Sequence, residues 1–446
     1  MSIEIKVKRG LHIPIKGYAL PALENAPRAK YYAVKPSDFI GVNPRLFVQP
    51  GDRVKAGDAL FYSKYRPEVV FASPVSGTVK EIVRGKRRVI LRIIIEADAR
   101  DEYRRFDASD RSRDDILKAL LSSGLFPYIK QRPYDIVPNP DDTPKTIYIS
   151  TFDTSPLAPD YAFALQKYKD EFQKGIDVLT KLTDGDVYLI VDGEQTNFFY
   201  DIRNVKLVKV TGPHPAGNVS VAIAHTHPIS KGDRIWTLRP WDTVFIGRLF
   251  NEGILNMQKN IAFTGDMLKK PQYYSLIPGA YIKDFLTDLL QETKNIRIIS
   301  GNPLTGTNIS NDGFIHTVDD SITVLREGNR PRFMGWLPFL GTSRKTVYRL
   351  NFDWFSGKER SYDTSLHGEE RPFVMTDEAE EVMPLDIYPV HLLKACLTGD
   401  VDKMERLGIL EVAPEDFALI DYISSSKIDA QKIIRDGLNI MMIEVG

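Results

Sequence analysis

The sequence predicts a multidomain α+β protein built from four successive parts, and three observations lead to this fold class. Short apolar strands separated by Gly-Asp turns fill residues 1–100 and indicate a small β-module. Strand and helix patterns then alternate over residues 101–256, which is typical of an α/β domain with a parallel sheet. Residues 257–330 return to short strands around one helix, and residues 331–446 combine an aromatic-rich linker with a helical C-terminal domain.

The N-terminal module is organised around residues 48–96. Gly-Asp turns at residues 51–52 and 57–58 bracket a short apolar segment, and this arrangement resembles the biotinyl/lipoyl carrier fold, a barrel-sandwich hybrid. Those carriers hold their cofactor on a lysine at a hairpin tip, and the matching position here is Arg66. Because arginine stays protonated and is a poor nucleophile, we expect the carrier fold without the carrier chemistry. We also expect the first forty residues to belong to this module.

Composition argues against several classes of function. The chain has 59 Lys and Arg against 59 Asp and Glu, so its zero net charge gives no reason to expect a nucleic-acid or anionic-membrane surface. No run of eighteen apolar residues predicts a membrane span, and no secretory signal is evident, so the cytosol is the expected compartment. The single cysteine, Cys396, excludes an internal disulfide framework and a cluster held by cysteines of this chain alone.

The middle of the chain predicts a Rossmann-like α/β domain. Its strand patterns are unbroken apolar runs, as expected for a parallel sheet covered on both faces. No Gly-x-Gly-x-x-Gly or Walker loop follows any strand, so a nucleotide site would need an unusual loop. Strands are predicted at residues 146–150, 187–191, 205–210 and 235–238, and helices at residues 114–124, 161–182 (possibly in two pieces around Gly175) and 240–251.

The most constrained loop is Gly-Pro-His-Pro-Ala-Gly at residues 212–217. Its prolines fix φ, and it follows a strand at the edge where α/β sheets place ligands. His225 and His227 come next and would share one face if their segment were extended. Because a His-x-His pair without a third ligand is a weak metal signal, we expect a structural role and no metal site.

Residues 257–330 read strand–strand–helix–strand and resemble a β-grasp soluble-ligand-binding (SLBB-type) domain, with a helix expected at 281–293. The glycine loop at residues 301–306 either cradles a ligand or simply turns the chain. Beyond it, glycines flank a group of large apolar side chains, which form either core or a docking surface. The candidates for partner docking are Trp336, Leu337, Phe339 and Leu340. Helices are expected at residues 390–397, 400–407, 414–423 and 430–438.

Taken together, the order of these parts resembles the NqrA family, the A-type subunits of the sodium-translocating NADH:quinone reductase (NQR complex), over essentially the full chain. The C-type subunit of a related electron-transport complex and the flavin-binding subunit of respiratory complex I share this layout. Those relatives carry iron–sulfur cysteines near the C-terminus, where this chain has Tyr-Ile-Ser-Ser-Ser-Lys at residues 422–427. The resemblance is carried by residues 212–217, Trp236, residues 242–250, Ile299-Ser300-Gly301, Gly335-Trp336, residues 382–387, Leu392-Leu393, Gly399-Asp400 and Leu407-Gly408.

The resemblance implies a peripheral subunit on the cytoplasmic face of the bacterial inner membrane. It would be one of six subunits (its partners being B to F) of a complex that oxidises NADH, reduces ubiquinone or menaquinone and pumps Na⁺ outward. The chain would be associated with quinone binding and assembly, while flavins, iron–sulfur centres and NADH stay on partner subunits. No catalytic residue is assigned, and the isolated chain is not expected to be catalytic. The candidate quinone contacts are His214, Pro215, His225 and His227.

Three other functions remain open. The chain resembles, more distantly, the C-type members of the related electron-transport complexes. A free-standing nucleotide-binding α/β protein is disfavoured by the missing glycine fingerprint. A carrier relative that only scaffolds would bind no small molecule. Titration of the purified chain with NADH, FMN and a quinone analogue would separate these alternatives.

Overall fold

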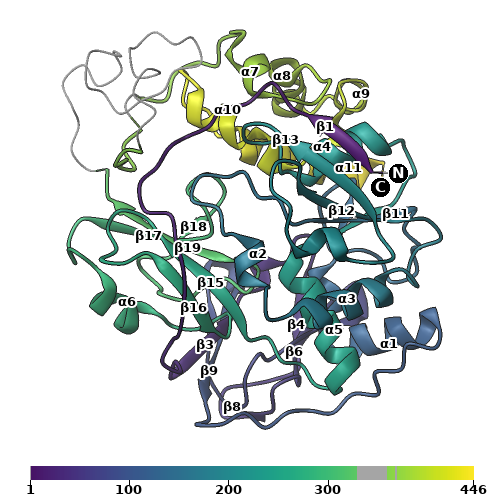
Figure 1. Ribbon diagram of the computed structural model, residues 1–446, viewed down its shortest axis with the longest axis vertical. Coiled ribbons are helices and arrows are strands. Elements are labelled where there is room, and N and C mark those ends of the chain that lie inside the picture. Colours follow the sequence, from purple (N-terminus) through teal and green to yellow (C-terminus); the bar gives the residue numbers. More distant parts are fainter. Residues whose placement is uncertain (1, 329–358, 367–368, 446) are drawn as a thin grey trace.

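The protein folds into three β-containing domains and a C-terminal group of helices (Figure 1). The computed structural model describes residues 2–328, 359–366 and 369–445. Within these residues the strands form four sheets, two in the N-terminal module and one in each of the next two domains. In the view of Figure 1 the N-terminal module lies at the bottom, the third domain at the left and the C-terminal helices at the top.

The N-terminal module packs two antiparallel sheets around an apolar core. Its strands are β3 (Tyr31–Val34), β4 (Pro44–Leu46), β5 (Arg53–Val54), β6 (Ala59–Ser63), β7 (Arg66–Ala72), β8 (Gly77–Arg84) and β9 (Ile90–Ala97). One sheet has the order β3-β9-β8-β5 and the other β4-β6-β7. Between them the rings of Phe61 and Phe71 stack at 4.3 Å, so alternate residues of the strands build the core.

The second domain is built on a six-stranded sheet of order β1-β13-β12-β11-β14-β10. Its strands are β1 (Ile3–Lys6), β10 (Lys130–Arg132), β11 (Thr146–Ser150), β12 (Val187–Asp192), β13 (Lys206–Thr211) and β14 (Ile235–Leu238). All neighbours are parallel except β10, which is antiparallel to β14. This order is that of a doubly wound sheet, as the alternation of strands and helices predicted.

The helices of this domain are α1 (Arg113–Ser123), α2 (Tyr161–Ala164), α3 (Lys169–Leu179), α4 (Val219–Thr226) and α5 (Pro240–Glu252). The helical pattern at 161–182 does divide in two, but the break lies at residues 165–168 and not at Gly175. Gly175 instead lies inside α3, where a Cβ would come within 2.1 Å of the carbonyl oxygen of Thr243 on α5. The glycine therefore permits a close crossing of two helices.

The third domain has a six-stranded sheet of order β18-β17-β19-β15-β16-β2 and one short helix, α6 (Lys283–Leu289). Its strands are β2 (Leu20–Asn25), β15 (Lys259–Thr264), β16 (Gln272–Leu276), β17 (Ile296–Ser300), β18 (Thr307–Asn308) and β19 (Ser321–Arg326). The helix is shorter than the predicted 281–293 because Leu290 is already extended and bridges to Leu268.

The expectation that the first forty residues belong to the N-terminal module is wrong for two strands. Strand β1 pairs in parallel with β13 of the second domain, with Ile3 opposite Val208. Strand β2 pairs in parallel with β16 of the third domain, with Leu20 opposite Gln272. Figure 1 shows this purple segment running along the outside of the molecule from β1 down to β3, so it ties three domains together.

The C-terminal helices share an apolar core with the second domain. They are α7 (Glu378–Val382), α8 (Pro389–Thr398), α9 (Val401–Arg406), the 3-10 turn η7 (Pro414–Phe417), α10 (Ala418–Ile423) and α11 (Ala430–Glu444). One continuous apolar cluster joins Val208 and Val221 to Leu392, Phe417 and Leu438. The four predicted helical stretches are thus confirmed, and the helices form one body with the α/β domain.

Candidate functional site

The loop at residues 212–217 follows β13 at the carboxyl edge of the parallel sheet, as predicted. Gly212 has a φ of 137°, and a Cβ there would lie 2.4 Å from the carbonyl oxygen of Val7. A Cβ on Gly217 would lie 2.1 Å from the carbonyl oxygen of Phe152. Both glycines are therefore required by close approach of the backbone. Pro215 follows a cis peptide bond within this loop.

His214 lies within the loop and is only 5% exposed. Its Nδ1 lies 3.2 Å from the Thr154 hydroxyl, which also accepts a hydrogen bond from the backbone N–H of Gly217 at 3.0 Å. Burial lowers the pKa of His214 to about 4, so the ring is neutral at pH 7. Its Nε2 has no hydrogen-bond partner among the described residues. His214 therefore supports the loop and is not presented to a ligand in solution.

His225 and His227 do not share one face of an extended segment, because α4 occupies residues Val219–Thr226. The His225 Nδ1 lies 2.8 Å from the carbonyl oxygen of Val221 within the same helix. The His227 Nδ1 lies 3.1 Å from the hydroxyl of Tyr148 on β11. His225 lies near the end of α4 and His227 directly after it, whereas His214 and Pro215 lie in the loop before this helix.

Two of the four candidate quinone contacts thus lie before α4, and the other two lie in its last turn or directly after it. Across the part of the chain that the structure describes, no three His, Cys, Asp or Glu side chains gather to hold a metal ion.

The sheet reverses its strand order between β11 and β14, which is the position where doubly wound sheets bind ligands. Here charged side chains of the second and third domains fill it. Lys259 of β15 places Nζ 2.7 Å from Oδ1 of Asp320, and the Tyr161 hydroxyl donates to Oδ2 at 2.9 Å. Arg239, directly after β14, pairs with Asp242 through two bonds of 2.9 and 3.2 Å.

Burial opposes ionisation of Asp320, but the charges of Lys259 and Arg239 outweigh it and lower the pKa of this carboxyl. Both cations thus already have carboxylate partners. A phosphate entering this crevice would have to compete with those carboxylates for every positive charge. The crevice is occupied by the chain itself.

The N-terminal module joins this junction through Asp38, which ends the 3-10 turn η1 (Pro36–Asp38). Its Oδ2 accepts hydrogen bonds from the backbone N–H and the hydroxyl of Thr317, at 2.9 and 3.0 Å. Its Oδ1 lies 2.7 Å from His316 Nδ1. Burial opposes the charge of His316, but Asp38 outweighs it and raises the pKa of the imidazole. Three domains therefore meet in one polar junction that sequence reasoning missed.

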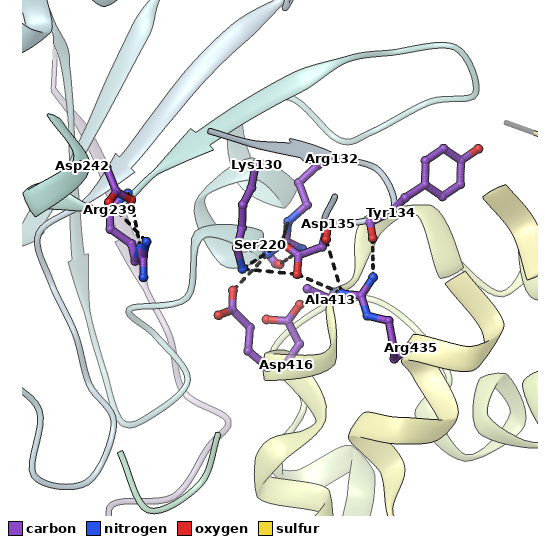
Figure 2. Close-up of polar contacts among 11 residues, drawn as sticks. Lys130, Arg132, Tyr134, Asp135, Ser220, Arg239, Asp242, Ala413, Asp416 and Arg435 are labelled. Carbon is purple, nitrogen blue, oxygen red and sulfur yellow. Dashed lines mark hydrogen bonds and ion pairs between the residues drawn. The ribbon is translucent and has the colours of Figure 1, made fainter. Parts of the chain in front are cut away.

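A second buried ion network joins the α/β domain to the C-terminal helices (Figure 2). Arg132 at the end of β10 donates to Glu415 of η7 at 3.0 Å, and Arg435 of α11 donates to Asp135 at 3.0 Å. Burial disfavours the charge of Asp135, but Lys130, Arg132 and Arg435 outweigh it and hold its pKa well below the usual range. No local pattern in Arg-Pro-Tyr-Asp at residues 132–135 marks this network in the sequence.

A cavity of about 170 Å³ opens between the N-terminal module and the third domain. Arg28 contributes to its lining and donates two hydrogen bonds to Asp101, at 2.9 and 2.7 Å. Aliphatic side chains at Leu276, Ile277 and Ile282 complete one side. The cavity thus combines an apolar wall with one ion pair. Its aromatic lining residues are Tyr32, Tyr103, Tyr281 and Phe285.

Comparison with known proteins places the chain in a family. Family models match residues 5–98 (the NqrA N-terminal barrel-sandwich hybrid domain), 111–255 (the NqrA second alpha/beta domain) and 260–311 (the NQRA C-terminal domain, an SLBB model). The A-type subunit of a Na(+)-translocating NADH-quinone reductase from Yersinia pestis bv. Antiqua (strain Angola) is 33% identical over 439 residues. That alignment covers 97% of this chain and 98% of the relative. The chain belongs to the NqrA family.

Other NqrA proteins match equally well. The corresponding reductase subunit from Photorhabdus laumondii is 34% identical over 445 residues, covering 97% of this chain and 98% of the relative. The one from Alcanivorax borkumensis is 33% identical over 449 residues, covering 99% and 100%. Among solved structures, a chain of an NAD+-reducing [NiFe]-hydrogenase aligns with 75% of this chain and 62% of its own length, at 12% identity and a TM-score of 0.41. A likeness of that degree does not indicate a shared function.

Membership of the NqrA family confirms the resemblance found in the sequence and the types of the first three domains. Arg66, which the sequence predicts at the position of the carrier lysine, donates from Nη1 to the carbonyl oxygen of Val137 at 3.2 Å. Its hairpin is therefore in contact with the α/β domain. None of the helices in the described ranges is long and apolar enough to cross a membrane. Trp336, Leu337, Phe339 and Leu340 lie outside the described residues.

Proposed function

We propose that this chain acts as the peripheral NqrA component of a Na⁺-translocating NADH:quinone reductase on the cytoplasmic face of the bacterial inner membrane. The observation that carries the proposal is the match to known NqrA proteins, at a third identity over nearly the full length of both chains. In this role the chain assembles with the five other subunits of the complex, which hold NADH, flavins and iron–sulfur centres. The complex passes electrons to ubiquinone or menaquinone and moves Na⁺ outward.

The assembly role is tested in a bacterial strain that lacks its own NqrA. Expression of the tagged chain should restore Na⁺-dependent NADH:quinone reductase activity, and the tag should recover the membrane subunits in mild detergent. A chain that restores no activity and recovers no membrane subunit, although folded and abundant, would contradict the proposal.

For the quinone we propose the cavity between the N-terminal module and the third domain in place of the four histidine and proline candidates. A dry cavity of about 150 Å³ holds a benzene ring, so about 170 Å³ suits one substituted ring. The aromatic walls offer stacking or edge-to-face contacts, and Arg28 offers hydrogen-bond donors near its pair with Asp101. His214, by contrast, is buried and neutral.

Calorimetric titration with a short-chain ubiquinone analogue tests this placement. Tyr103→Ala and Phe285→Ala each remove one aromatic wall and should weaken binding about 2–10-fold. His225→Ala, a change outside the cavity lining, is the matched control and should bind like the unmodified chain. Melting temperatures identify a variant that has lost its fold. This site would be contradicted if the His225→Ala variant lost as much affinity for the quinone analogue as the cavity variants, or if the two cavity variants lost none.

Docking to a membrane-bound partner is proposed, from sequence alone, for the stretch around Trp336 and Phe339. Truncating aromatic anchors at an interface costs about 2–4 kcal/mol of binding. The double variant Trp336→Ala, Phe339→Ala should therefore keep its melting temperature when isolated and fail to assemble. A large drop in melting temperature would assign these side chains to the core instead.

A further inference from the structure

The hairpin that joins β8 to β9 carries a concentration of positive charge that the zero net charge of the chain conceals. Four of the five residues from 84 to 88 are basic, and the next three positions are all aliphatic. We call residues 84–91 the basic tip. Its members are Arg84, Gly85, Lys86, Arg87, Arg88, Val89, Ile90 and Leu91.

The backbone of the basic tip is well defined. Arg84 lies opposite Ile90 in the β8–β9 ladder, and its guanidinium donates to the carbonyl oxygen of Arg88 at 3.1 Å. Arg87 and Arg88 have φ values of 55° and 60°, the left-handed conformation that turns the chain sharply. The side chains from 86 to 89 are consequently directed into solvent.

Apolar side chains stand beside these cations. Val89 is 57% exposed and Leu91 is 45% exposed, although both belong to the aliphatic residues that usually lie inside proteins. The nearest stretch of sequence, residues 80–98, contains no aromatic residue. The basic tip thus presents a mixed cationic and aliphatic surface without a stacking platform.

The cations of the basic tip are not neutralised by the chain. Over residues 2–328, 359–366 and 369–445, no ion pair involves Arg84, Lys86, Arg87 or Arg88. The two acids of the same strands lie on the stem of the hairpin, and one of them, Glu96, already pairs with Lys30 and Lys80. The charge is therefore available to an external anionic surface.

We propose that the basic tip binds the surface of an anionic lipid bilayer. Its cations contact the headgroup phosphates, and Val89 and Leu91 enter the headgroup layer, where aliphatic burial adds to the electrostatic attraction. Nucleic acid fits less well, because non-specific binding to single strands relies on aromatic stacking that residues 80–98 do not supply. This contact is independent of the other subunits and goes beyond the proposed function.

The proposal is tested by flotation of the purified full chain with vesicles. Vesicles of phosphatidylcholine containing about one third phosphatidylglycerol should bind the chain, and pure phosphatidylcholine vesicles should not. Each basic residue near such a surface is worth about a fivefold change in partition, so Lys86→Glu with Arg87→Glu should reduce binding about 25-fold or more. Val89→Ser with Leu91→Ser should reduce binding while leaving its salt dependence in place.

The matched control is Lys118→Glu with Lys167→Glu, which makes the same charge change at two exposed positions of the second domain. This control should bind vesicles almost like the unmodified chain, and all variants should keep their melting temperatures. The proposal would be overturned if the chain bound neutral and anionic vesicles equally, or if the control variant lost as much vesicle binding as the Lys86→Glu, Arg87→Glu variant. Tighter binding of single-stranded RNA than of anionic vesicles at the same salt would also overturn it. Because co-purification with membrane subunits is measured separately, the two proposals can fail independently.

Discussion

Lys259 and Asp320 form an ion pair, with 2.7 Å between Nζ and Oδ1, in which Lys259 is 1% and Asp320 8% exposed. One partner begins β15 and the other immediately precedes β19, and the Tyr161 hydroxyl from the second domain donates to the same carboxylate. The pair therefore lies where the third domain covers the strand-order reversal of the parallel sheet. Its charge is structural, since every described group in this network faces another protein group.

Lys259→Met should destabilise the protein by about 3–5 kcal/mol, because it leaves the Asp320 carboxylate buried without its partner. The double variant Lys259→Met, Asp320→Leu should recover much of that loss, since an apolar pair replaces both charges. Denaturant unfolding measures both. The exposed pair of Lys30 and Glu96 is the control, and Lys30→Ala should change stability little. A Lys259→Met variant as stable as the unmodified chain would show that the pair is not desolvated.

The stability of the protein should fall as pH drops from 6.5 towards 4, in part because of His214. Its pKa is about 4 when folded and 6.5 as a free side chain, so the unfolded state binds more protons in this window. One such group contributes about 2 kcal/mol less stability at pH 5 than at pH 7. The His214→Gln variant lacks this titrating group. The unfolding free energy of the unmodified protein minus that of the variant should therefore be about 2 kcal/mol smaller at pH 5 than at pH 7. A difference independent of pH would contradict burial of a neutral ring.

The chain should not bind NADH tightly. The backbone N–H groups of Ser155 and Glu194, at the carboxyl edge of the sheet, already donate to Asp153 and Asp192 at 2.8 Å. A pyrophosphate needs free N–H groups there, and the adjoining carboxylates would repel it. Calorimetry with purified protein should detect no micromolar affinity, and a measured value in that range would contradict this interpretation.

Asp135→Asn should loosen the C-terminal helices. The change leaves Arg132 and Arg435 next to each other without the carboxylate between them, at a cost of about 3 kcal/mol or more. Hydrogen exchange should accelerate in α11 while β12, in the middle of the sheet, stays protected. Lys432→Ala, which removes only the exposed pair with Asp436, is the control and should leave exchange unchanged. Unchanged hydrogen exchange in the Asp135→Asn variant would assign the contact between α11 and the α/β domain to apolar packing alone.

Local signals in the sequence located most elements. The predicted helices at 114–124 and 240–251 correspond to α1 and α5, which end at Gly124 and Gly253 in the left-handed conformation that favours glycine. The helical pattern at 161–182 was less informative, because its apolar period continues through the break at 165–168, where tertiary contacts decide the backbone. Residues 3–6 and 20–25 were assigned to the wrong domain, since a local pattern does not identify the neighbour of a strand.

The candidate site was predictable only in part. The place of the 212–217 loop followed from its position after a strand, whereas the surroundings of His214 include a distant segment at Gly10, whose backbone lies against the His214 carbonyl oxygen. The ion networks were invisible to local patterns. Arg132 and Glu415 are far apart in sequence, and each alone looks like an ordinary surface charge. Such pairs are fixed by the folded arrangement of domains and by nothing in their immediate sequence.

The pairing of β1 and β2 has a consequence for synthesis on the ribosome. The module between Tyr31 and Ala97 holds its strand partners close by and is able to close soon after it emerges. Ile3, however, pairs with Val208, and Leu20 pairs with Gln272. Both strands therefore stay unpaired while roughly 200 more residues are translated. At about 5–20 residues per second this delay lasts tens of seconds. Although translated before most of the chain, these two strands are paired only after β13 and β16 have been made, so a chaperone that holds unpaired strands has a long opportunity to bind them.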